Sequence, residues 1–590
     1  MSDNDDDSDD EDNDDELHFA TLNTSQNSAV NFGLDKANSL VLLQGPPGTG
    51  KTYTISVLLE QLYKSGLRVG ICASTNKAVH VAMEQFVNKF KGNERSKLNI
   101  SLIGVDESIP KNLQEFFVHY ASKKFREQYQ QLQKLTEELE DISLQENLDE
   151  EKLLQKVLEI SSKGKKFFDI GIQIVKLDNQ VHVFQSILKK LEDFIKDKSN
   201  CNPMRNYKIS SLPQDVHILM CSMEHTLEDV LGDEQNIEGI LLNSTQFLFL
   251  TLACCGRHSI RQTRKVDILI CDEASQALEV ETLIAMSLRP TKIILVGDPR
   301  QLSAIVQSQN AISKKFDRSL MSRLMDIRDA KYHMLDTQYR MHPKISKWPS
   351  KQYYNNLLRN ANSVVDKKRN WKFPDGYQPL TFFNCNKGKE ARDHTGSHKN
   401  EEEAERVIQI MSEIQKLNKN IQVKVITYYS AQVNLIRNKL HRKKGYSYGD
   451  ARRLVITVDA FQGSEADVII LSFVRTQKSV GFLSDARRLN VSLTRAKDLL
   501  VIVGNYDQLK DCNSDDIKSL MKHVADTDAF YLDATERKRR YEAAMIAKEK
   551  EDAERKHREL IESLKQKQMM EEAEREERIK MMNEQGSCSL

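Results

Sequence analysis

The stretch that most constrains the fold is SLVLLQGPPGTGKTYTISVLLEQLYKSG, at residues 39–66. An apolar run, a glycine-rich loop ending in lysine and threonine, and a helix-forming segment follow one another directly. This order predicts a buried strand, a phosphate-binding loop and a helix whose N-terminus faces the phosphates. The loop residues expected to offer backbone N–H groups to the phosphates are Gly45, Gly48, Thr49 and Gly50. Lys51 is predicted to neutralise β/γ-phosphate charge, and Thr52 to ligate Mg²⁺.

A second motif, which is acidic, supports the prediction of a phosphate-binding site. In VDILICDEASQ, residues 266–276, Asp272 and Glu273 directly follow an apolar run that reads as a buried strand. Side chains at the carboxyl ends of parallel strands meet where such sheets bind ligands. Asp272 is expected to hold Mg²⁺ through water, and Glu273 to polarise the attacking water as general base. Together the two motifs predict hydrolysis of ATP or GTP.

The remaining apolar runs indicate the fold class. Near-continuous runs separated by helical stretches are typical of parallel strands that helices cover on both faces. They cluster before about residue 300 and after about residue 420, so two sheets are expected rather than one. The expected strands are SLVLL, RVGICAS, VDILICDE, TKIILVGD, VKVITYY, LVITV, DVIILSFV and LLVIVGN.

Composition excludes several classes of protein. No run of about 18 apolar residues and no signal peptide occur, so we expect neither a membrane span nor secretion. The nine cysteines are scattered, without a CxxC pair. Cys72 and Cys271 fall in strand-like runs, where reduced core thiols are expected, and a structural zinc site is not.

Charge is distributed unevenly along the chain. Residues 1–16 contain eleven acids and no base. The remaining chain has 86 basic residues against 75 acidic ones, a net charge of +11. A basic body with a disordered acidic leader suits a polyanionic partner, although a solvated tail on an ordinary enzyme fits the charge equally well.

Two segments are expected to be helical additions. Residues 91–240 interrupt the first sheet and read as a helical excursion rather than as part of it. This insertion is expected either to clamp or split a nucleic acid or to be a tolerated surface excursion. Residues 533–584 read as one charged helix, for which a single solvated helix is favoured over a coiled-coil dimer.

Taken together, the motifs resemble those of superfamily 1 helicases of the nonsense-mediated-decay and senataxin group, and within it the senataxin branch. The resemblance covers residues 22 to about 505, apart from the insertion. The ordered motifs that carry it are LNTSQNSAV, GPPGTGKT, STNKAV, DEASQALEVETLIAM, LVGDPRQL, SLMSRLM, LDTQYRMHPKISKWPSKQYY, VDAFQGSEADVIILSFVR and DARRLNVSLTRAK.

The resemblance implies roles for six further residues. Gln26 matches the glutamine that reads the adenine edge, and Tyr339 an aromatic that stacks on the base. Gln301 matches a γ-phosphate sensor, and Glu465 a residue near the ribose. Arg340 and Arg495 match the two arginines that approach the phosphates from the second domain. Such arginines contribute on the order of 10³–10⁵ in rate.

The resemblance also implies an architecture and a function. The fold class is α/β, with two tandem RecA-like parallel-sheet domains, a helical insertion in the first and a charged C-terminal helix. The expected boundaries are 1–16 (acidic leader), 17–325 (domain 1, with the 91–240 insertion), 326–510 (domain 2) and 511–590 (helical tail). The implied function is an ATP- and Mg²⁺-dependent helicase or translocase on single-stranded RNA or DNA, or on RNA–DNA hybrids, moving 5′ to 3′ as the cleft between the domains closes and opens.

Several motifs depart from the family pattern. CASTNKAVH has Ser74 and His80 where relatives have proline and aspartate, and ITYY has Tyr428 for proline. TLACC and QLSA also differ, and every change falls on the nucleic-acid side. ATP hydrolysis is therefore expected more firmly than processive unwinding. Candidate strand contacts are Ser74, Thr75, Asn76, Thr427, Tyr429, Thr457 and Asp459, each of which an ordinary strand-end cap explains nearly as well.

Other hypotheses stay open. Relatives carry a β-barrel and stalk before the adenine-reading motif; with about twenty residues before Gln26, we expect that domain to be absent or the chain to be incomplete. A nucleotide-switched RNA-binding clamp or scaffold without unwinding is the alternative function, and a DNA-directed repair helicase a third. A monomer is expected, with a protein partner for the leader or the C-terminal helix. Nuclear placement rests on the resemblance; RKRR at 537–540 reads as an import signal or a basic turn, and a cytoplasmic site stays open.

Overall fold

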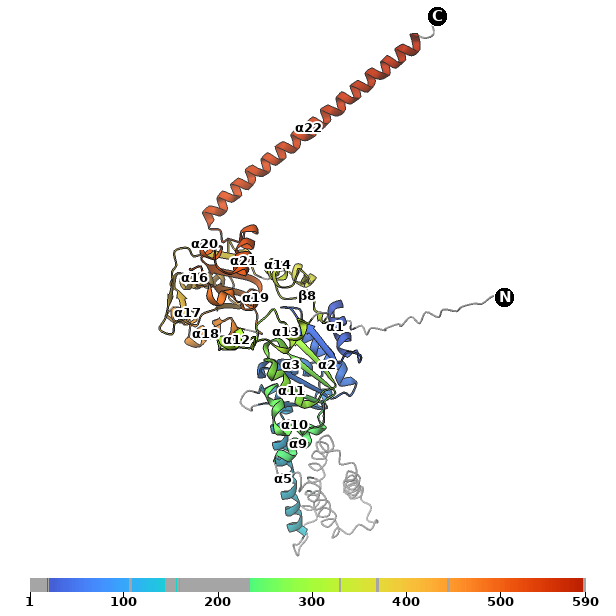
Figure 1. Cartoon of the computed structure of the whole chain (residues 1–590), viewed down its shortest axis with the longest axis vertical. Helices are drawn as coiled ribbons and strands as arrows, with labels where there is room; N and C mark the ends of the chain where they lie inside the picture. The colour runs from blue at the N-terminus through green and yellow to red at the C-terminus, as the bar shows by residue number, and fades with distance from the viewer. Residues whose placement is uncertain are drawn as a thin grey trace, which may run out of the picture. The chain divides into compact units, whose positions relative to one another are not determined.

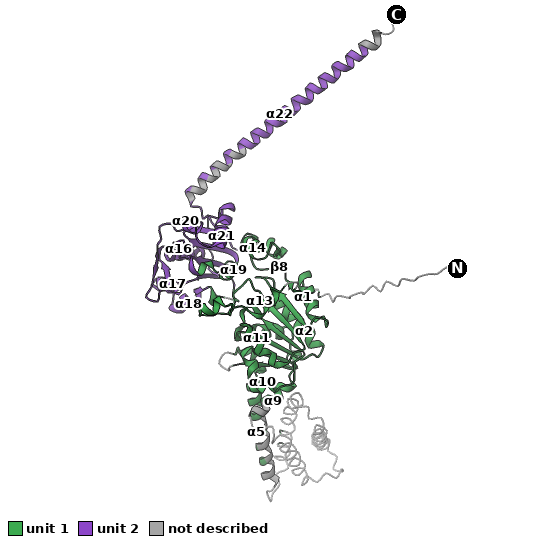
Figure 2. Cartoon of the chain, viewed as in Figure 1, with its two compact units in different colours: residues 1–367, 458–464, 482–496 green, residues 368–457, 465–481, 497–590 purple. Residues whose placement is uncertain are grey.

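The chain folds into two compact units, each described here by itself (Figure 2). Unit 1 comprises residues 1–367, 458–464 and 482–496; unit 2 comprises residues 368–457, 465–481 and 497–590. The computed structural model describes residues 19, 21–104, 109–143, 155, 159, 234–327, 330–367, 371–442, 446–461 and 463–586. The acidic leader and most of the predicted insertion lie outside these residues.

Unit 1 is built on a sheet of seven described strands, all paired in parallel. Their order is β3-β4-β2-β5-β6-β1-β7. β6 therefore lies between β1, which leads into the phosphate loop, and β5, which ends at Asp272. The strands are β1 (Leu40–Gln44), β2 (Val69–Ala73), β3 (Ile100–Ile103), β4 (Phe247–Thr251), β5 (Ile268–Asp272), β6 (Lys292–Gly297) and β7 (His333–Met334). A separate parallel pair joins β8 (Thr337–Gln338) to β9 (Arg359–Asn360).

Two of the helices that pack on this sheet, α1 and α3, begin at clear side-chain caps. Asn23 caps the first of them in a reciprocal capping box with Gln26, and the hydroxyl of Thr75 accepts the N–H of Ala78 at the start of α3. The α-helices are α1 (Thr24–Leu34), α2 (Lys51–Lys64), α3 (Asn76–Val87), α4 (Asn93–Ser96), α5 (Val118–Ser143), α9 (Glu234–Ser244), α10 (His258–Arg261), α11 (Glu279–Ala285), α12 (Gln309–Ser313), α13 (Leu320–Met325), α14 (Pro343–Tyr353), α15 (Asn362–Val365) and α19 (Ala486–Leu493). The 3₁₀ turns are η2 (Lys111–Phe116), η4 (Ala253–Gly256), η5 (Ala274–Gln276), η6 (Met286–Leu288) and η7 (Asp459–Phe461), with η8 (Gly481–Ser484) where the chain passes from unit 2 to unit 1.

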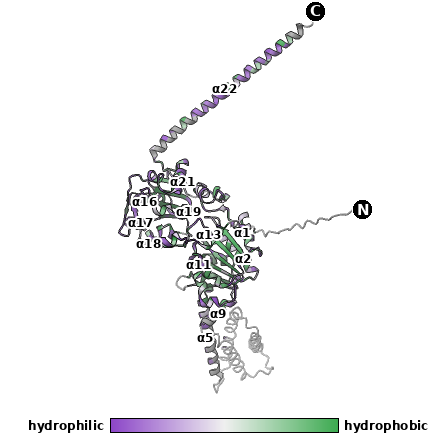
Figure 3. Ribbon diagram, in the orientation of Figure 1, coloured by the Kyte–Doolittle hydropathy of each residue, from purple (hydrophilic) through white to green (hydrophobic). Residues whose placement is uncertain are grey.

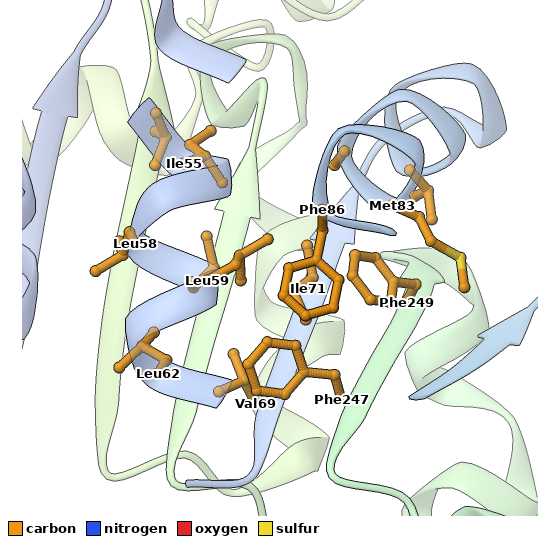
Figure 4. Packing of buried hydrophobic residues seen from close by; sticks show 14 of the residues in the cluster. Ile55, Leu58, Leu59, Leu62, Val69, Ile71, Met83, Phe86, Phe247 and Phe249 are labelled. Carbon is orange, nitrogen blue, oxygen red and sulfur yellow. The ribbon is translucent and has the colours of Figure 1, made fainter. Parts of the chain in front are cut away.

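The core of unit 1 lies between α2, α3 and the sheet (Figure 4). Phe86 of α3 is fully buried, and its ring centroid lies 5.4 Å from that of Phe247 and 6.1 Å from that of Phe249. Leu59 and Ile71 fill the space between α2 and β2 (Figure 4). This packing fixes the helix that starts at the phosphate loop against β2, which pairs with β5, the strand that ends at Asp272.

One expectation is corrected at the start of the predicted insertion. The sequence predicts residues 91–240 to be helical and outside the sheet, but β3 is an edge strand of the sheet, with Ile100 paired with Phe247. The run ISLI is short, yet its four residues are all buried, because they pack on β4. β4 itself, FLFLT, was not among the expected strands. After β3, the described parts α5 and α9 are helical and lie side by side (Figure 1).

Unit 2 holds a second parallel sheet, of order β10-β16-β15-β13-β14. Its strands are β10 (Leu380–Asn384), β13 (Val423–Thr427), β14 (Val455–Thr457), β15 (Ala466–Ser472) and β16 (Ala496–Gly504), beside an antiparallel hairpin of β11 (Glu390–Arg392) and β12 (His398–Asn400). The helices are α16 (Glu401–Leu417), α17 (Ser430–Arg442), α18 (Tyr448–Leu454), α20 (Tyr506–Leu509), α21 (Asp515–Asp526) and α22 (Ala534–Gly586). The predicted α/β class with two parallel sheets is thus confirmed, and each of the eight expected strands is found.

The last helix, α22, is 53 residues long, and all but one of its described side chains are exposed between residues 549 and 581. Figure 3 shows the contrast between this hydrophilic helix and the apolar strands. The predicted charged C-terminal helix is therefore confirmed as a helix. Among the described residues, no helix combines the length and the apolar character that a membrane span needs.

Candidate active site

The phosphate loop joins β1 to α2 and has the geometry of an anion cradle. Gly50, the residue before α2, has φ 75° and no side chain to cap the helix, so the first N–H groups of α2 stay available to a ligand. Gly48 has φ 76°, and a Cβ atom there would lie 2.7 Å from Cβ of Arg340. Both positions require glycine, since other residues pay a steric penalty in the left-handed region.

Lys51 lies against both acids of the second motif. Its Nζ is 2.6 Å from Oε1 of Glu273 and 3.9 Å from Oδ1 of Asp272. Lys51 and Asp272 are largely buried, with 13% and 6% of the side chains exposed, whereas the Glu273 side chain is 28% exposed. The structure therefore brings together the three charged residues that the sequence assigned to phosphate, metal and water.

Burial and mutual attraction set the protonation of this group. Burial raises the pKa of Asp272 to about 6, although Lys51 opposes the shift. Burial also disfavours the charged form of Glu273, but Lys51, Gln276 and Arg495 together hold the pKa of Glu273 below its ordinary value. Burial likewise disfavours the charged Lys51, yet both carboxylates raise its pKa overall. Lys51 is therefore charged, and Glu273 is ionised, at neutral pH.

The backbone and a neighbour both hold Glu273 in place. Its φ of 51° lies in the left-handed region, which is unfavourable for a residue with a side chain. Its N–H donates to Oδ1 of Asp272 over 2.8 Å, and Nε2 of Gln276 donates to its Oε2 over 2.5 Å. Such strain is retained where a side chain must be aimed, as at a catalytic base.

The predicted base-reading residues both bond to the backbone of the phosphate loop. Gln26 is buried, and its Nε2 donates to the carbonyl oxygen of Thr49 over 3.0 Å. Tyr339 is 42% exposed, and its N–H donates to the carbonyl oxygen of Gly48 over 2.8 Å. Asn23, which sequence reasoning passed over, links the two by donating from Nδ2 to the hydroxyl of Tyr339 over 2.6 Å. Beside this bond and the one that Oε1 accepts from the N–H of Asn23, the Gln26 amide keeps a second N–H and a second lone pair for a base edge.

The two predicted arginines both belong to unit 1. Arg340 packs over Gly48, and its Nη1 donates to the carbonyl oxygen of Thr494 over 3.2 Å. Arg495 is 3% exposed, and its Nη2 donates to Oε1 of Gln301 over 2.7 Å. The structure thus joins the predicted sensor directly to one of the predicted arginines.

Behind Gln301 lies a buried polar group that the sequence analysis did not single out. Asp298, at the end of β6, accepts from Nε2 of Gln301 over 2.8 Å and from the hydroxyl of Tyr354 over 2.7 Å. Nδ2 of Asn490, on α19, donates to the same hydroxyl over 2.7 Å. The letters LVGDPRQL, KQYY and RLNVSLTRAK contain these residues, but no local pattern signals that they meet.

The remaining predicted residues are less closely tied to this site. Thr52 is half-buried in the first turn of α2. Glu465 belongs to unit 2, where its Oε1 pairs with Nζ of Lys497 at 3.0 Å, so its predicted place near the ribose stays a prediction. Among the described residues, no group of three or more His, Cys, Asp or Glu is arranged to hold a metal ion.

The candidate strand contacts divide into exposed and buried residues. Ser74, Thr75 and Asn76 lie at the partly exposed end of β2 and start of α3. In unit 2, Thr427 is 0% and Tyr429 3% exposed. These two predictions are wrong as surface contacts, because the sheet and the loop before Gly481 cover both side chains, and the hydroxyl of Tyr429 donates to the carbonyl oxygen of Val480 over 3.1 Å.

Thr457 and Asp459 are the two remaining candidates. Thr457, the last residue of β14, is half-buried. Asp459, in unit 1, accepts from Nε of Arg488 over 3.1 Å, so its carboxylate is already paired. Neither observation tests whether Thr457 or Asp459 binds nucleic acid, so both roles stay predictions.

Comparison with known proteins gives this geometry a family context. Two domain families, each described as an AAA domain, match residues 21–309 and 316–507. The chain is 30% identical over 522 residues to "Helicase sen1" of Schizosaccharomyces pombe, 30% over 520 residues to "Probable helicase senataxin" of Homo sapiens, and 30% over 512 residues to "Uncharacterized ATP-dependent helicase MJ0104" of Methanocaldococcus jannaschii.

These matches involve most of the chain but unequal parts of the relatives. They cover 83%, 80% and 84% of this chain, respectively. They span 29% of sen1 and 18% of human senataxin, but 69% of the archaeal protein. The two family matches, residues 21–309 and 316–507, contain both sheets and every site residue described above.

Proposed function

The chain belongs to the superfamily 1 helicases of the nonsense-mediated-decay and senataxin group, a family of ATP-dependent helicases, and from that premise we propose that it hydrolyses ATP in unit 1 and uses the energy to move along or unwind nucleic acid. The observation that carries the proposal is the gathering of Lys51, Glu273, Gln301, Arg340 and Arg495 within unit 1. The chain's own residues thus supply charge neutralisation, a base and a sensor at one edge of one sheet.

The ion pair between Lys51 and Glu273 suggests how substrate binding activates the base. When triphosphate oxygens bind at the loop, Lys51 exchanges its carboxylate partner for phosphate, because the phosphates carry the larger negative charge. Glu273, released from Lys51, then accepts a proton from the attacking water. Hydrolysis is thereby confined to the time when a triphosphate is bound.

The donor set also fits a magnesium ion. Thr52 and Asp272 would hold it, with hard oxygen ligands and room for water and phosphate oxygens, which Mg²⁺ prefers to an all-protein cage. The ion would neutralise phosphate charge during transfer. The buried Asp272 accepts the N–H of Glu273 and lies 3.9 Å from the Lys51 ammonium, and a cation would stabilise its carboxylate further.

We propose RNA or an RNA–DNA hybrid as the substrate, on the strength of the resemblance to senataxin. The direct test is steady-state phosphate release by the full chain, with and without short single-stranded RNA or DNA. We expect severalfold stimulation by one of the polymers, and no turnover by Lys51→Ala, which removes the phosphate-binding ammonium. Turnover that no polynucleotide changes would sink the proposal of a nucleic-acid motor.

A clamp or scaffold ATPase without unwinding remains the second candidate, because Thr427 and Tyr429 are buried where a strand contact was expected. Strand-displacement assays on RNA–DNA duplexes with a single-stranded loading tail separate the two functions. A motor displaces the strand at saturating ATP, whereas a clamp binds the duplex and hydrolyses ATP without displacing it.

A further inference from the structure

The polar group behind Gln301 joins three segments that are far apart in the chain. Asp298 follows β6, Tyr354 follows α14, and Asn490 lies on α19. All three are buried, with 1%, 2% and 0% of their surfaces exposed. Nδ2 of Asn490 also donates to the carbonyl oxygen of Arg300 over 2.8 Å, which ties α19 to the loop that carries Gln301.

Neutral donors surround the carboxylate of Asp298. Oδ2 accepts from Tyr354 and Gln301, while Oδ1 accepts from Nε2 of Gln44 and from the N–H of Arg300, both over 3.1 Å. Among the described residues, no basic side chain forms an ion pair with Asp298. A buried carboxylate without such a partner is stabilised by its hydrogen bonds. The loss of one donor therefore destabilises the charged carboxylate and weakens the whole network.

Asp298 determines which way the amide of Gln301 points. A carboxylate only accepts hydrogen bonds and a guanidinium only donates them. Nε2 of Gln301 must therefore face Asp298, which leaves Oε1 to accept from Arg495. If Asp298 gains a proton or turns away, the amide can rotate, and Arg495 loses the acceptor that holds it.

We infer that Tyr354 and Asn490 are positioning residues that act through Asp298 to hold Gln301 and Arg495 in the arrangement that hydrolysis requires. This inference rests on the proposed function, because it concerns the same ATP site. Neither residue reaches the reacting atoms; both set the orientation of residues that do. The hydroxyl of Tyr354 links the other two residues, since it donates to Asp298 and accepts from Asn490.

The same geometry predicts a change in the dependence of kcat on pH. Burial raises the pKa of Asp298, and the bond from Tyr354 is the foremost of the hydrogen bonds that oppose the rise. The other titratable groups that face Asp298 are the Lys51 ammonium and, through Gln301, Arg495. Removing the hydroxyl therefore favours protonated Asp298, and the acid limb of the kcat profile moves to higher pH.

The test compares Tyr354→Phe with Tyr377→Phe, both as full chains. Tyr377 is a matched control: it is 8% exposed and donates to Oε2 of Glu413 over 2.6 Å, but in unit 2. For Tyr354→Phe we expect kcat to fall about tenfold or more, as for loss of a bond to a charged group, with KM for ATP within about twofold. Binding of ADP with aluminium fluoride should weaken by a similar factor, and the acid limb should shift. The control should match wild type in all three.

A second variant keeps the result interpretable if Tyr354→Phe is poorly folded. Asn490→Ala should lower kcat in the same way, and the double variant should be no slower than about the slower single variant, because both changes break one network. Independent, multiplying losses would overturn the inference, as would a Tyr354→Phe enzyme with wild-type kcat and an unmoved acid limb. An inactive wild-type chain would instead defeat the proposed function.

Discussion

At the scale of single residues, the site depends on side chains that have two alternative partners. Lys51 pairs with Glu273 in the structure and is expected to bind phosphate in the reaction. Gln26 bonds to Thr49 and is expected to bind adenine. In both cases the expected ligand contact would add to or replace an internal bond, so Lys51 and Gln26 already have partners before substrate arrives.

Replacing Glu273 by glutamine tests the base directly. Glu273→Gln keeps the size of the side chain but replaces one of the two oxygens that face Lys51 and Gln276 by an amide nitrogen, and so removes the proton acceptor. We expect turnover to fall by about 10²–10⁴-fold while ATP stays bound. Quench-flow measurement of bound ATP against released phosphate checks this. Wild-type hydrolysis by the variant would show that another group takes the proton.

Replacing Gly48 by alanine tests the close approach of Arg340. The new Cβ would meet Cβ of Arg340 at 2.7 Å in a left-handed backbone, so the loop or the arginine must shift. We expect at least about tenfold loss of kcat/KM for ATP. Gly66→Ala is the control: its φ is 74°, but nothing lies within 4 Å of the added atom. It should cost about 1 kcal/mol of stability and leave turnover unchanged. Equal losses in both variants would assign the effect to backbone strain alone.

At the scale of elements, helix starts and strand ends place the charged groups. α2 directs its uncapped N-terminus at the phosphate loop, whereas α16 begins with a buried carboxylate in its first turn. Glu403 is 0% exposed and accepts from the hydroxyl of Ser472 over 2.7 Å and from the N–H of Val474 over 2.8 Å. These bonds hold the start of α16 against β15.

The stability of unit 2 should therefore depend on pH through Glu403. Burial raises its pKa from 4.5 to about 8, so the folded state favours the protonated form. Stability is full below pH 4.5 and falls as pH rises toward 8, by at most about 1.4 kcal/mol per pH unit. Glu403→Gln should remove this loss, so its advantage in urea unfolding grows from pH 5 to pH 8. The exposed Glu405→Gln is the control, and an advantage independent of pH would contradict the assignment.

At the scale of the whole molecule, the two sheets and α22 differ in what stabilises them. Each sheet buries apolar strands beneath helices, whereas α22 is exposed along its described length and gains support from local pairs such as Arg555 with Asp552, at 3.1 Å. Exposed pairs of this kind contribute little energy each. We therefore expect that residues 549–590 can be removed without destabilising the two folded units.

Truncation after residue 548 tests this separability. We expect the thermal midpoint of the rest of the chain to change by less than about 2 °C, because few packed contacts are lost, with basal ATP turnover unchanged. Circular dichroism at 222 nm should fall in proportion to the helix removed. A clear drop in midpoint or turnover would mean that α22 packs on one of the units in solution.

The features of this protein that lie in contiguous residues can be predicted from the sequence. The loop from Gly45 to Thr52, the acids Asp272 and Glu273 after their strand, and the charged helix α22 were all readable, because strand, turn and helix signals act over a few residues. The eight expected strands were readable for the same reason, since buried parallel strands are apolar along their whole length. The short edge strand β3 gave no such signal.

Contacts between side chains that are far apart in the chain depend on how the elements pack. Tyr354, Asp298 and Asn490 are separated by 56 and 136 positions in the chain, and their contact depends on how α14, β6 and α19 pack. The burial of Thr427 and Tyr429 depends equally on neighbouring strands and loops. Local patterns fix what an element is, but a hydrogen bond between elements exists only once packing has brought both groups within about 3 Å of each other.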